Sequence, residues 1–472
     1  MKVKFIGAAR EVTGSKTLIT TDDGKKILLD CGMFQGKGLE TDELNRRTGV
    51  NPAELDHIIL SHAHIDHSGL IPYFYKFGFR GSVICTTATR NLCSIMLPDS
   101  GHIQQADTEW FNKKRARQNL PRVEPIYDLE DAEQALKLFI AVDNNRRFYI
   151  NDKINVKFTN TGHMLGSSVV NLEITENGKK IRLAYTGDIG RPHNRILSGP
   201  VPFPQCDYLI TESTYGNRLH ETEKQTEEDF LKIITETCVV NKGKLIIPSF
   251  AIGRTQEVVF VLNKFFNDGL LPRIKVYVDS PLAVNATDIF RMHLDLMNED
   301  VKREIKEGDH DPFGFNNLIY IKKVEQSKEL NELNEPCIII SASGMAEAGR
   351  IKHHIANNIS NPHNTIMLVG YCSPTSLGAR IQEPDLKEIS IFGKMHDVKA
   401  RITRMGAFAG HGDYNEMKSF LECQEKSAVK KTFLVHGEYE VQQFYREILS
   451  KDGFKNIEIP AYGNEFELNQ VN

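Results

Sequence analysis

The feature that most constrains this chain is the stretch SHAHIDHSG at residues 61–69, which places His62, His64, Asp66 and His67 within six positions. It follows the apolar run IIL, so the four side chains leave the end of a predicted strand on one loop. Neutral imidazole and carboxylate are the standard protein ligands for zinc and similar metals. Burying four such groups without a metal would require a separate hydrogen-bond partner for each of them. The stretch therefore predicts a metal site, and the fold must bring further ligands to it from elsewhere.

Composition limits the class of protein. A chain of 472 residues predicts two to four domains, and a net charge of −4 excludes a surface that is basic throughout, so a polyanion site must come from local charge or from metal. The eight cysteines form no CxxC pair, which indicates reduced thiols in an intracellular protein. There is no signal-peptide core and no apolar run of membrane-spanning length. We therefore expect a cytoplasmic protein without a membrane partner.

The two ends of the chain are β-rich, and the middle has a different pattern. The first part predicts a helix at 69–77, a mostly helical region at 90–140, and strands at 3–7, 17–21, 25–30, 55–62, 81–89, 154–160, 168–174, 179–187 and 206–213. Beyond about residue 220, strands that feed helices recur at 243–266, 273–290, 336–355 and 364–381, which is typical of a parallel sheet covered by helices. The style of the first part returns at 401–414, 430–440 and 456–462. We predict an α/β chain in which a domain at 215–394 interrupts another domain formed by 1–214 and 395–472.

Two Thr-Gly turns offer candidates for the missing ligands. TGHMLGSS at 161–168 presents His163 after a predicted strand, and TGDIG at 186–190 presents Asp188 after the apolar strand IRLAY. Taken singly, either could be an ordinary turn residue, because aspartate is common in turns. Together with the histidine cluster they form a set of metal ligands, each at the end of a strand.

Asp30 in LLDCG, the HxHxDH cluster, His163 and Asp188 follow one another in an order that resembles the metallo-β-lactamase superfamily. The resemblance implies an αββα sandwich with a metal site at the edge between its two sheets. It also implies two metal ions with Asp188 bridging them, and with the other ligands divided as His62, His64 and His163 for one ion and Asp66 and His67 for the other. Asp30 would orient ligands without touching the metal, as metal-bound histidines usually require.

Three later motifs narrow the resemblance: TEST at 211–214 with Glu212, GHGD at 410–413 with His411, and LVHGE at 434–438 with His436. They look like motifs A, B and C of the β-CASP group, whose members carry an inserted α/β domain. The whole chain resembles the ribonucleases similar to the nuclease subunit of the cleavage and polyadenylation specificity factor. In that family a histidine at motif C goes with RNA, so the resemblance implies an RNA substrate, single-stranded in our expectation. Ala409 and Gly410 replace the usual Ser-Ala before the motif B histidine, which puts the local backbone geometry in question.

The implied chemistry suits these residues. A phosphodiester resists hydrolysis because its negative charge repels the nucleophile and because an alkoxide leaves poorly. Two metals about 3.5–4 Å apart neutralise the phosphate and make a bridging hydroxide available near neutral pH. His436 would complete the second metal's ligands, and His411, held by Glu212, would protonate the leaving oxygen, although in isolation it could be a turn histidine. The catalytic candidates are Asp30, Asp66, Glu212 and His411. Ligands without thiolate suit zinc and tolerate manganese or iron.

Three strand-to-helix turns of the 215–394 domain could hold RNA phosphates, because free N–H groups at a helix start attract anions. The alternative is plain turn chemistry, since any α/β domain needs Gly and Ser at such junctions. The substrate-binding candidates are Ser249, Gly253, Arg254 and Thr255 in the first turn, Ser341, Ser343, Gly344 and Arg350 in the second, and Ser376, Gly378 and Arg380 in the third. In contrast, KKRAR (Lys113, Lys114, Arg115 and Arg117) favours a solvated helix face over a binding stripe.

The leading hypothesis is a dinuclear-zinc ribonuclease that cuts RNA internally. The alternative in the same class is a 5′-to-3′ exoribonuclease of the RNase J type, which a pocket for a 5′-phosphate would reveal. We see neither the C-terminal domain of RNase J nor the N-terminal RNA-binding extension of archaeal relatives, which favours an endonuclease. A flavodiiron oxidoreductase would resemble HxExDH, with Glu in place of His64, and a scaffold subunit would have lost ligands. Among partners, a homodimer is a weakly supported expectation.

Overall fold

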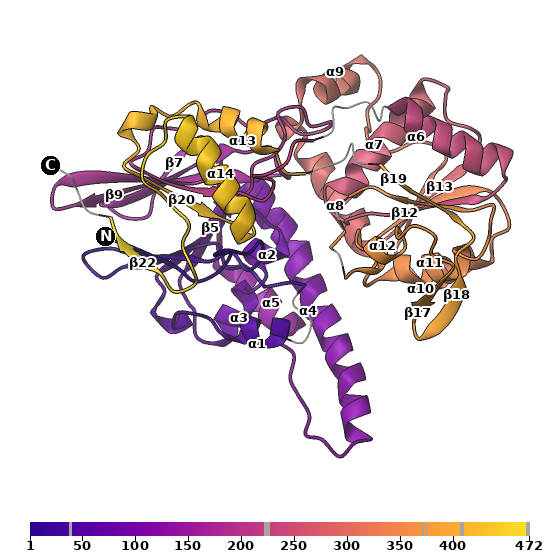
Figure 1. The fold of residues 1–472 in the computed structure, drawn as a ribbon, viewed down its shortest axis with the longest axis horizontal. Coiled ribbons are helices and arrows are strands. Elements are labelled where there is room, and N and C mark those ends of the chain that lie inside the picture. Colours follow the sequence, from indigo (N-terminus) through magenta and orange to yellow (C-terminus); the bar gives the residue numbers. More distant parts are fainter. Residues whose placement is uncertain (37–39, 221–226, 371, 374, 406–409, 469–472) are drawn as a thin grey trace. The chain divides into compact units, whose positions relative to one another are not determined.

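The computed structural model describes residues 1–36, 40–220, 227–370, 372–373, 375–405 and 410–468 (Figure 1). The chain divides into two compact units, which we call the sandwich unit (Met1–Leu219 with Gly410–Asn472) and the inserted unit (His220–Ala409). Each unit has its own sheets and its own hydrophobic core. The three-part division at residues 214 and 394 remains a proposal. Among the described residues, no helix is long and apolar enough to cross a membrane.

The sandwich unit contains two mixed sheets of seven strands each. The first has the order β22 (Glu465–Glu467), β1 (Lys2–Phe5), β2 (Thr17–Thr20), β3 (Lys26–Leu29), β4 (His57–Ile59), β5 (Ser82–Thr86) and β6 (Phe139–Val142). The second has the order β21 (Ile457–Glu458), β20 (Lys431–Val435), β11 (Tyr208–Glu212), β10 (Lys179–Tyr185), β9 (Ser168–Glu176), β8 (Ile154–Asn160) and β7 (Arg147–Tyr149).

The main core lies between these two sheets. Side chains alternate in burial along β9, as expected for a strand whose two faces differ, and inward residues of both sheets form one buried cluster that includes Phe5, Ile59, Phe158 and Leu183. On the outer face of the second sheet, Leu209 and Leu434 pack against helices α13 (Tyr414–Leu421) and α14 (Tyr439–Lys451). The first sheet carries α1 (Glu40–Arg46), α2 (Ile65–Ser68), α3 (Ile71–Lys76), α4 (Thr87–Ala116) and α5 (Leu129–Ala135). The predicted αββα sandwich is confirmed.

The inserted unit is built on one parallel sheet, and all five pairings between its strands are parallel. Its order is β14 (Leu318–Ile321), β13 (Lys275–Asp279), β15 (Cys337–Ser341), β12 (Lys244–Pro248), β16 (Thr365–Leu368) and β19 (Arg401–Arg404). Its helices are α6 (Glu227–Ile234), α7 (Arg254–Asn267), α8 (Pro281–Met292), α9 (Glu299–Glu307), α10 (Val324–Glu332), α11 (Arg350–Asn358) and α12 (Leu377–Arg380), and a small hairpin joins β17 (Glu388–Ile391) to β18 (Lys394–Asp397). The predicted parallel sheet is confirmed.

The chain re-enters the sandwich unit beside the strand at which it left. Strand β20, after the insertion, pairs in parallel with β11, before it, with Glu212 opposite Val435. His411 forms a bridge with Gly190, next to the turn that carries Asp188. The segments before and after the insertion therefore bring the TEST, GHGD and LVHGE motifs together at the carboxyl ends of β11 and β20.

Candidate metal centre

Seven ligand-type side chains of the sandwich unit converge where strands of both sheets end. His62 to His67 follow β4, His163 follows β8, Asp188 follows β10 and His436 follows β20. Asp30 and His436 hold backbone φ angles of 58° and 53°, a left-handed conformation that residues other than glycine seldom adopt. Their surroundings must hold them there, which is common where side chains are aimed at a site.

The first group of ligand atoms comes from His62, His64, His163 and Asp188, one atom from each lying within 4.8 Å of all the others. The His64 Nδ1 lies 3.2 Å from both His62 Nε2 and His163 Nε2. Burial lowers the pKa of His62 and His163, and it lowers the pKa of His64 to about 3, because a buried imidazolium loses its hydration. The three rings are therefore neutral and direct nitrogen lone pairs at one point.

The second group comes from Asp66, His67 and His436, whose ligand atoms also lie within 4.8 Å of one another. His67 Nε2 is 3.1 Å from His436 Nε2, which is 3.4 Å from Asp66 Oδ2. Asp188 faces both groups: its Oδ2 is 3.4 Å from His62 Nε2 and from His163 Nε2, while its Oδ1 is 3.3 Å from His67 Nε2.

Asp188 Oδ1 is the atom that best tests whether a metal fits. It is buried and has no hydrogen-bond partner in the described part of the chain. A buried carboxylate oxygen without a partner is costly, and a cation held between the two groups would satisfy it. The donor set of imidazole and carboxylate, without thiolate, fits zinc. These residues thus form a His/Asp cluster suited to metal.

Contacts behind the cluster orient the rings. His67 Nδ1 donates to Asp30 Oδ2 at 2.6 Å, and His163 Nδ1 donates to the Gly410 carbonyl at 3.3 Å. The Ser61 hydroxyl donates to Asp30 and so accepts from His62 Nδ1, at 3.0 Å. Thr214 Oγ1 accepts from His436 Nδ1 at 2.9 Å. In all four histidines Nδ1 has a partner behind the cluster and Nε2 is the nitrogen that faces into it, the orientation that metal-ligating histidines require.

A third group, Glu212 and His411, lies beside Asp188. Glu212 is buried and lies 3.1 Å from His411 Nδ1 through its Oε2. Burial acts to lower the pKa of His411, but the Glu212 carboxylate more than offsets it and the pKa rises to about 9. The His411 side chain is 21% exposed, whereas Asp188 and Glu212 are almost fully covered. His411 is therefore a protonated group at neutral pH that a ligand can reach.

The structure brings together every residue that the sequence analysis placed in the metal centre. Three contributors were missed: Ser61, Tyr185, whose hydroxyl donates to Asp30 Oδ2 at 2.7 Å, and Thr214. Ser61 and Thr214 adjoin the motifs and could have been suspected for that reason. Tyr185 gave no signal, because a tyrosine at the end of an apolar strand looks like a core residue. Ala409, the departure before motif B, lies outside the described residues.

The three predicted phosphate-binding turns meet at the carboxyl ends of the inserted sheet. In the first turn, Thr255 Oγ1 donates to the Phe250 carbonyl at 2.7 Å, and Arg254 pairs with Glu257. In the second, Arg350 pairs with the buried Asp279 at 2.7 Å. Gly344 approaches the Phe250 ring so closely that a Cβ atom would lie 2.6 Å from it.

Several of these candidates have internal partners. Ser249 and Ser343 form hydrogen bonds within their own turns, and Ser341 Oγ donates to the Asp279 carbonyl at 2.7 Å. Ser376 caps α12, Gly378 packs against Met345, and the Gly253 N–H donates to Gln256. Arg380 is exposed at the end of α12. These contacts suit turn chemistry, and a role of any of these residues in RNA binding remains a proposal.

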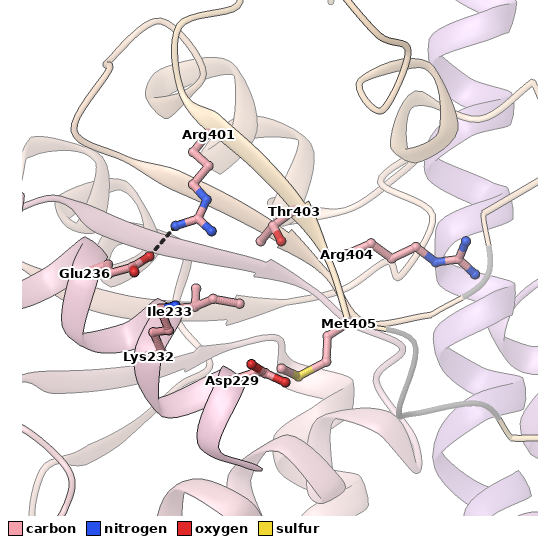
Figure 2. Close-up of a pocket in the computed structure, with 8 residues that line it drawn as sticks. All are labelled: Asp229, Lys232, Ile233, Glu236, Arg401, Thr403, Arg404 and Met405. Atoms are coloured by element: carbon pink, nitrogen blue, oxygen red, sulfur yellow. Dashed lines mark hydrogen bonds and ion pairs between the residues drawn. The ribbon is translucent and has the colours of Figure 1, made fainter. Parts of the chain in front are cut away.

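A separate cavity of about 250 Å³ lies in the inserted unit between α6 and β19 (Figure 2). It is lined by Asp229, Lys232, Ile233, Glu236, Arg401, Thr403, Arg404 and Met405. Arg401 is paired with Glu236 at 2.6 Å. None of the predicted site residues is among those that line this cavity.

Comparison with known proteins finds three family models that match the chain. They are the Metallo-beta-lactamase superfamily over residues 10–90, the Beta-Casp domain over 255–381, and the Zn-dependent metallo-hydrolase RNA specificity domain over 395–460. The first includes the HxHxDH cluster, and the third includes His411 and His436. The matched segments follow the chain in the order that the motifs predict.

Similar proteins occur in all three domains of life. Ribonuclease TTHA0252 of Thermus thermophilus is 33% identical over 98% of this chain and 99% of its own length. The RNase J-like protein of Methanocaldococcus jannaschii is 32% identical over 98% of this chain and 97% of its own length. The Cleavage and polyadenylation specificity factor 73 of Drosophila melanogaster is 28% identical over 93% of this chain and 60% of its own length.

Proposed function

We propose a function from one premise: the chain belongs to the β-CASP group of the metallo-β-lactamase superfamily. Our proposal is a ribonuclease that hydrolyses RNA phosphodiester bonds with two zinc ions. The observation that carries it is Asp188, a buried carboxylate that faces two groups of inward-pointing ligands and leaves one oxygen without a hydrogen bond. The family model for a Zn-dependent metallo-hydrolase RNA specificity domain supports both zinc and RNA.

We assign His62, His64 and His163 to one ion and Asp66, His67 and His436 to the other, with Asp188 shared. When bound, the ions would supply the positive charge that neutralises the phosphate and the Lewis acidity that activates a water for attack. Asp30 positions the cluster, because it accepts from His67, Ser61 and Tyr185 at once. That carboxylate fixes which nitrogen of His67 carries the proton.

His411 is the proposed general acid. It is the more exposed partner of the Glu212 pair, and its raised pKa keeps a proton on the ring at neutral pH. An imidazolium beside the cluster can give that proton to the departing ribose oxygen, which would otherwise leave as an alkoxide. Glu212 holds the ring through Nδ1, so that Nε2 is the nitrogen left to meet the substrate.

Internal cleavage is the leading form of this activity. The alternative is 5′-to-3′ exonuclease action, which is favoured by the similarity to a protein named RNase J-like over nearly the whole of both chains. The two differ in the first product they release. An endonuclease gives internal fragments of many lengths from the start, whereas an exonuclease releases mononucleotides from one end.

The decisive experiment uses one RNA labelled at the 5′ end or at the 3′ end, with a DNA of the same sequence as control. Internal fragments from RNA alone, lost in Asp66→Ala and His411→Ala, would support the proposal. His363→Ala changes an exposed histidine of the inserted unit and should cleave as the wild type does. Equal cleavage of DNA, or cleavage that survives loss of Asp66, would contradict it.

A further inference from the structure

The end of helix α4 carries large apolar side chains in an exposed position. Helix α4 runs over Thr87–Ala116, and Figure 1 shows it as a long helix whose far end extends away from the sheets of its unit. We define the α4 tip as residues 110–123. Trp110, the only tryptophan of the chain, is 68% exposed there, and Phe111, Leu120 and Val123 are exposed as well. Exposed apolar side chains that gather in one patch, unlike single ones, mark a surface that binds another molecule.

Hydrogen bonds hold the α4 tip in a defined conformation. The buried Asn112 side chain donates to the Val123 carbonyl at 2.8 Å and accepts from the Val123 N–H at 2.9 Å. Arg115 Nε donates to the Pro121 carbonyl at 2.6 Å. These bonds tie the segment after the helix back onto its last turns. The apolar side chains are therefore held outward by a defined scaffold.

The α4 tip is also strongly basic. Five cations, Lys113, Lys114, Arg115, Arg117 and Arg122, lie between residues 110 and 123, where there is no acidic residue. Within the described parts of the chain, no carboxylate forms an ion pair with any of the five, and all but Arg115 are exposed. The end of helix α1 shows the contrast, because Arg46 in its last turn pairs with Asp42 and Arg47 just beyond it pairs with Glu43. The chain as a whole carries a net charge of −4, so this is a local concentration.

We propose that the α4 tip binds single-stranded RNA outside the metal centre. Its lysines and arginines contact phosphates, and Trp110 stacks on a base. Stacking aromatics among unpaired cations are the combination that single strands require, and it tolerates any sequence. The conclusion that the bound polyanion is RNA rests on the proposed function. The conclusion that the tip binds a polyanion rests on the charge and exposure of the tip. Binding here would give KKRAR, which the sequence analysis interpreted as a solvated helix face, a role in RNA binding.

The length of α4 sets which RNAs can use this contact. The helix begins beside the metal centre, because the Thr86 hydroxyl donates at 2.8 Å to the carbonyl of Gly166, three residues after His163. Trp110 lies 24 residues beyond Thr86, so the tip lies about 36 Å away along the helix. An RNA of a few nucleotides cannot occupy both places. We expect the tip to matter for long substrates and not for short ones.

The test compares the triple variant Lys113→Gln, Lys114→Gln, Arg117→Gln with a matched control, Arg446→Gln, Lys451→Gln, Lys455→Gln. The control removes three exposed cations from another surface of the same unit. The probe is a 2′-O-methyl oligouridylate of about 30 nucleotides, checked on a gel for integrity. Its anisotropy reports affinity, and Trp110 fluorescence reports contact at the tip. The binding constant for a single strand falls with salt according to the number of phosphates that the protein neutralises. The slope of the logarithm of the binding constant against the logarithm of the salt concentration should therefore become shallower by about 2 in the tip variant.

We expect quenching of Trp110 by the oligomer, at least fivefold weaker binding in the tip variant and in Trp110→Ala, and wild-type binding in the control. With a 30-nucleotide RNA substrate, KM should rise at least fivefold in the tip variant, whereas cleavage of a tetranucleotide should not change. Equal loss in the control, or no quenching, would overturn the inference. A response of Trp110 to anionic vesicles but not to RNA would overturn it as well. Cleavage without tip binding would defeat this inference alone, and tip binding without cleavage would defeat the proposed function alone.

Discussion

At the scale of single residues, Asp188 and His411 divide the work that we propose for the site. Asp188 is buried and faces both ligand groups, whereas His411 is partly exposed and is paired with Glu212. The two side chains come from opposite ends of the insertion, and the Gly190–His411 bridge brings them together. Their environments shift their pKa values in opposite directions: downward for Asp188, where attraction to the surrounding histidines outweighs burial, and upward for His411. Both shifts favour the charged forms, as expected where carboxylates and imidazoles face one another.

The pH profile of kcat should report His411. Its pKa of about 9 means that the ring is protonated below that pH and loses its proton above it, so the rate of RNA cleavage should fall as pH rises through about 9. Glu212→Gln removes the carboxylate that raises this pKa, and the alkaline fall should move to lower pH. An alkaline limb that stays in place in Glu212→Gln would show that another group supplies the proton.

Removal of His411 should reduce the rate and leave the metal in place. We expect His411→Ala to lower kcat by about 10²- to 10⁴-fold, the usual contribution of a general acid, with zinc content at the wild-type level. The measurement is single-turnover cleavage together with metal analysis of the same sample. Loss of zinc in this variant would instead make His411 a ligand.

Asp30 should act through the ligands that it holds. Asp30→Asn keeps the size of the side chain but weakens its hold on His67, and changes of this kind typically cost 10- to 100-fold in metal affinity. Tyr185→Phe removes one of the donors to Asp30 and should give a smaller loss. Asp56→Asn, which breaks a surface pair with Lys25, is the matched control and should bind zinc as the wild type does. Competition with a zinc chelator measures all three.

At the scale of elements, loops meet closely to form the site. Two segments pack on the HxHxDH loop: after β3, the Cys31 N–H donates to the His67 carbonyl at 2.7 Å, and before β2, the Ser15 N–H donates to the Asp66 carbonyl at 2.8 Å. Gly32 lies at this contact, where a Cβ atom would fall 1.6 Å from the Asp66 carbonyl oxygen. The glycine is needed for the close approach of two backbones.

Gly32→Ala should therefore damage the site without touching a ligand. Forcing a methyl group into packed backbone costs about 1–3 kcal/mol or more, and the Asp66 loop must move to admit it. We expect a lower melting temperature and reduced zinc content. Gly370→Ala, where the nearest atom to the new methyl would be 3.8 Å away, is the control and should melt near the wild type. Full zinc content in Gly32→Ala would mean that the contact does not shape the centre.

Some features of the site and of the strand pairing could be predicted from the sequence, and others could not. The HxHxDH cluster, His163 and Asp188 could be predicted because metal ligands concentrate in short motifs at strand ends. Tyr185 could not, because nothing local distinguishes it from a core tyrosine. Strand β19 is short and polar, and the sequence analysis grouped it with the closing segment, yet it pairs with β16 of the inserted sheet. Which strand pairs with which depends on contacts far apart in sequence.

At the scale of the whole molecule, the ligands of the metal centre come from chain segments on both sides of the insertion. His436 lies 248 residues after Asp188, and the parallel pairing of β11 with β20 returns it to the cluster. The site therefore cannot form until both parts of the sandwich unit have folded together. The α/β class and the parallel sheet of the insertion followed from strand and helix patterns, and the αββα sandwich followed from the family resemblance. The order of strands in the two sandwich sheets had no local signal.

Removal of metal should weaken the sandwich unit. A ligand that binds only the folded state stabilises it, by about 2.7 kcal/mol at a concentration 100 times its dissociation constant. We expect a chelator to lower the unfolding temperature of wild-type protein and to have little effect on Asp188→Ala, which has already lost its ions. Scanning calorimetry with and without chelator measures this. A chelator effect of equal size in both proteins would contradict the assignment of Asp188.

The central claim is that two zinc ions share Asp188, and the number of zinc ions per chain in native mass spectrometry tests it most directly. We predict two ions in the wild type, one in Asp66→Ala, and none retained tightly in Asp188→Ala, while His363→Ala keeps two. A single ion in the wild type, or two ions in Asp188→Ala, would contradict the account.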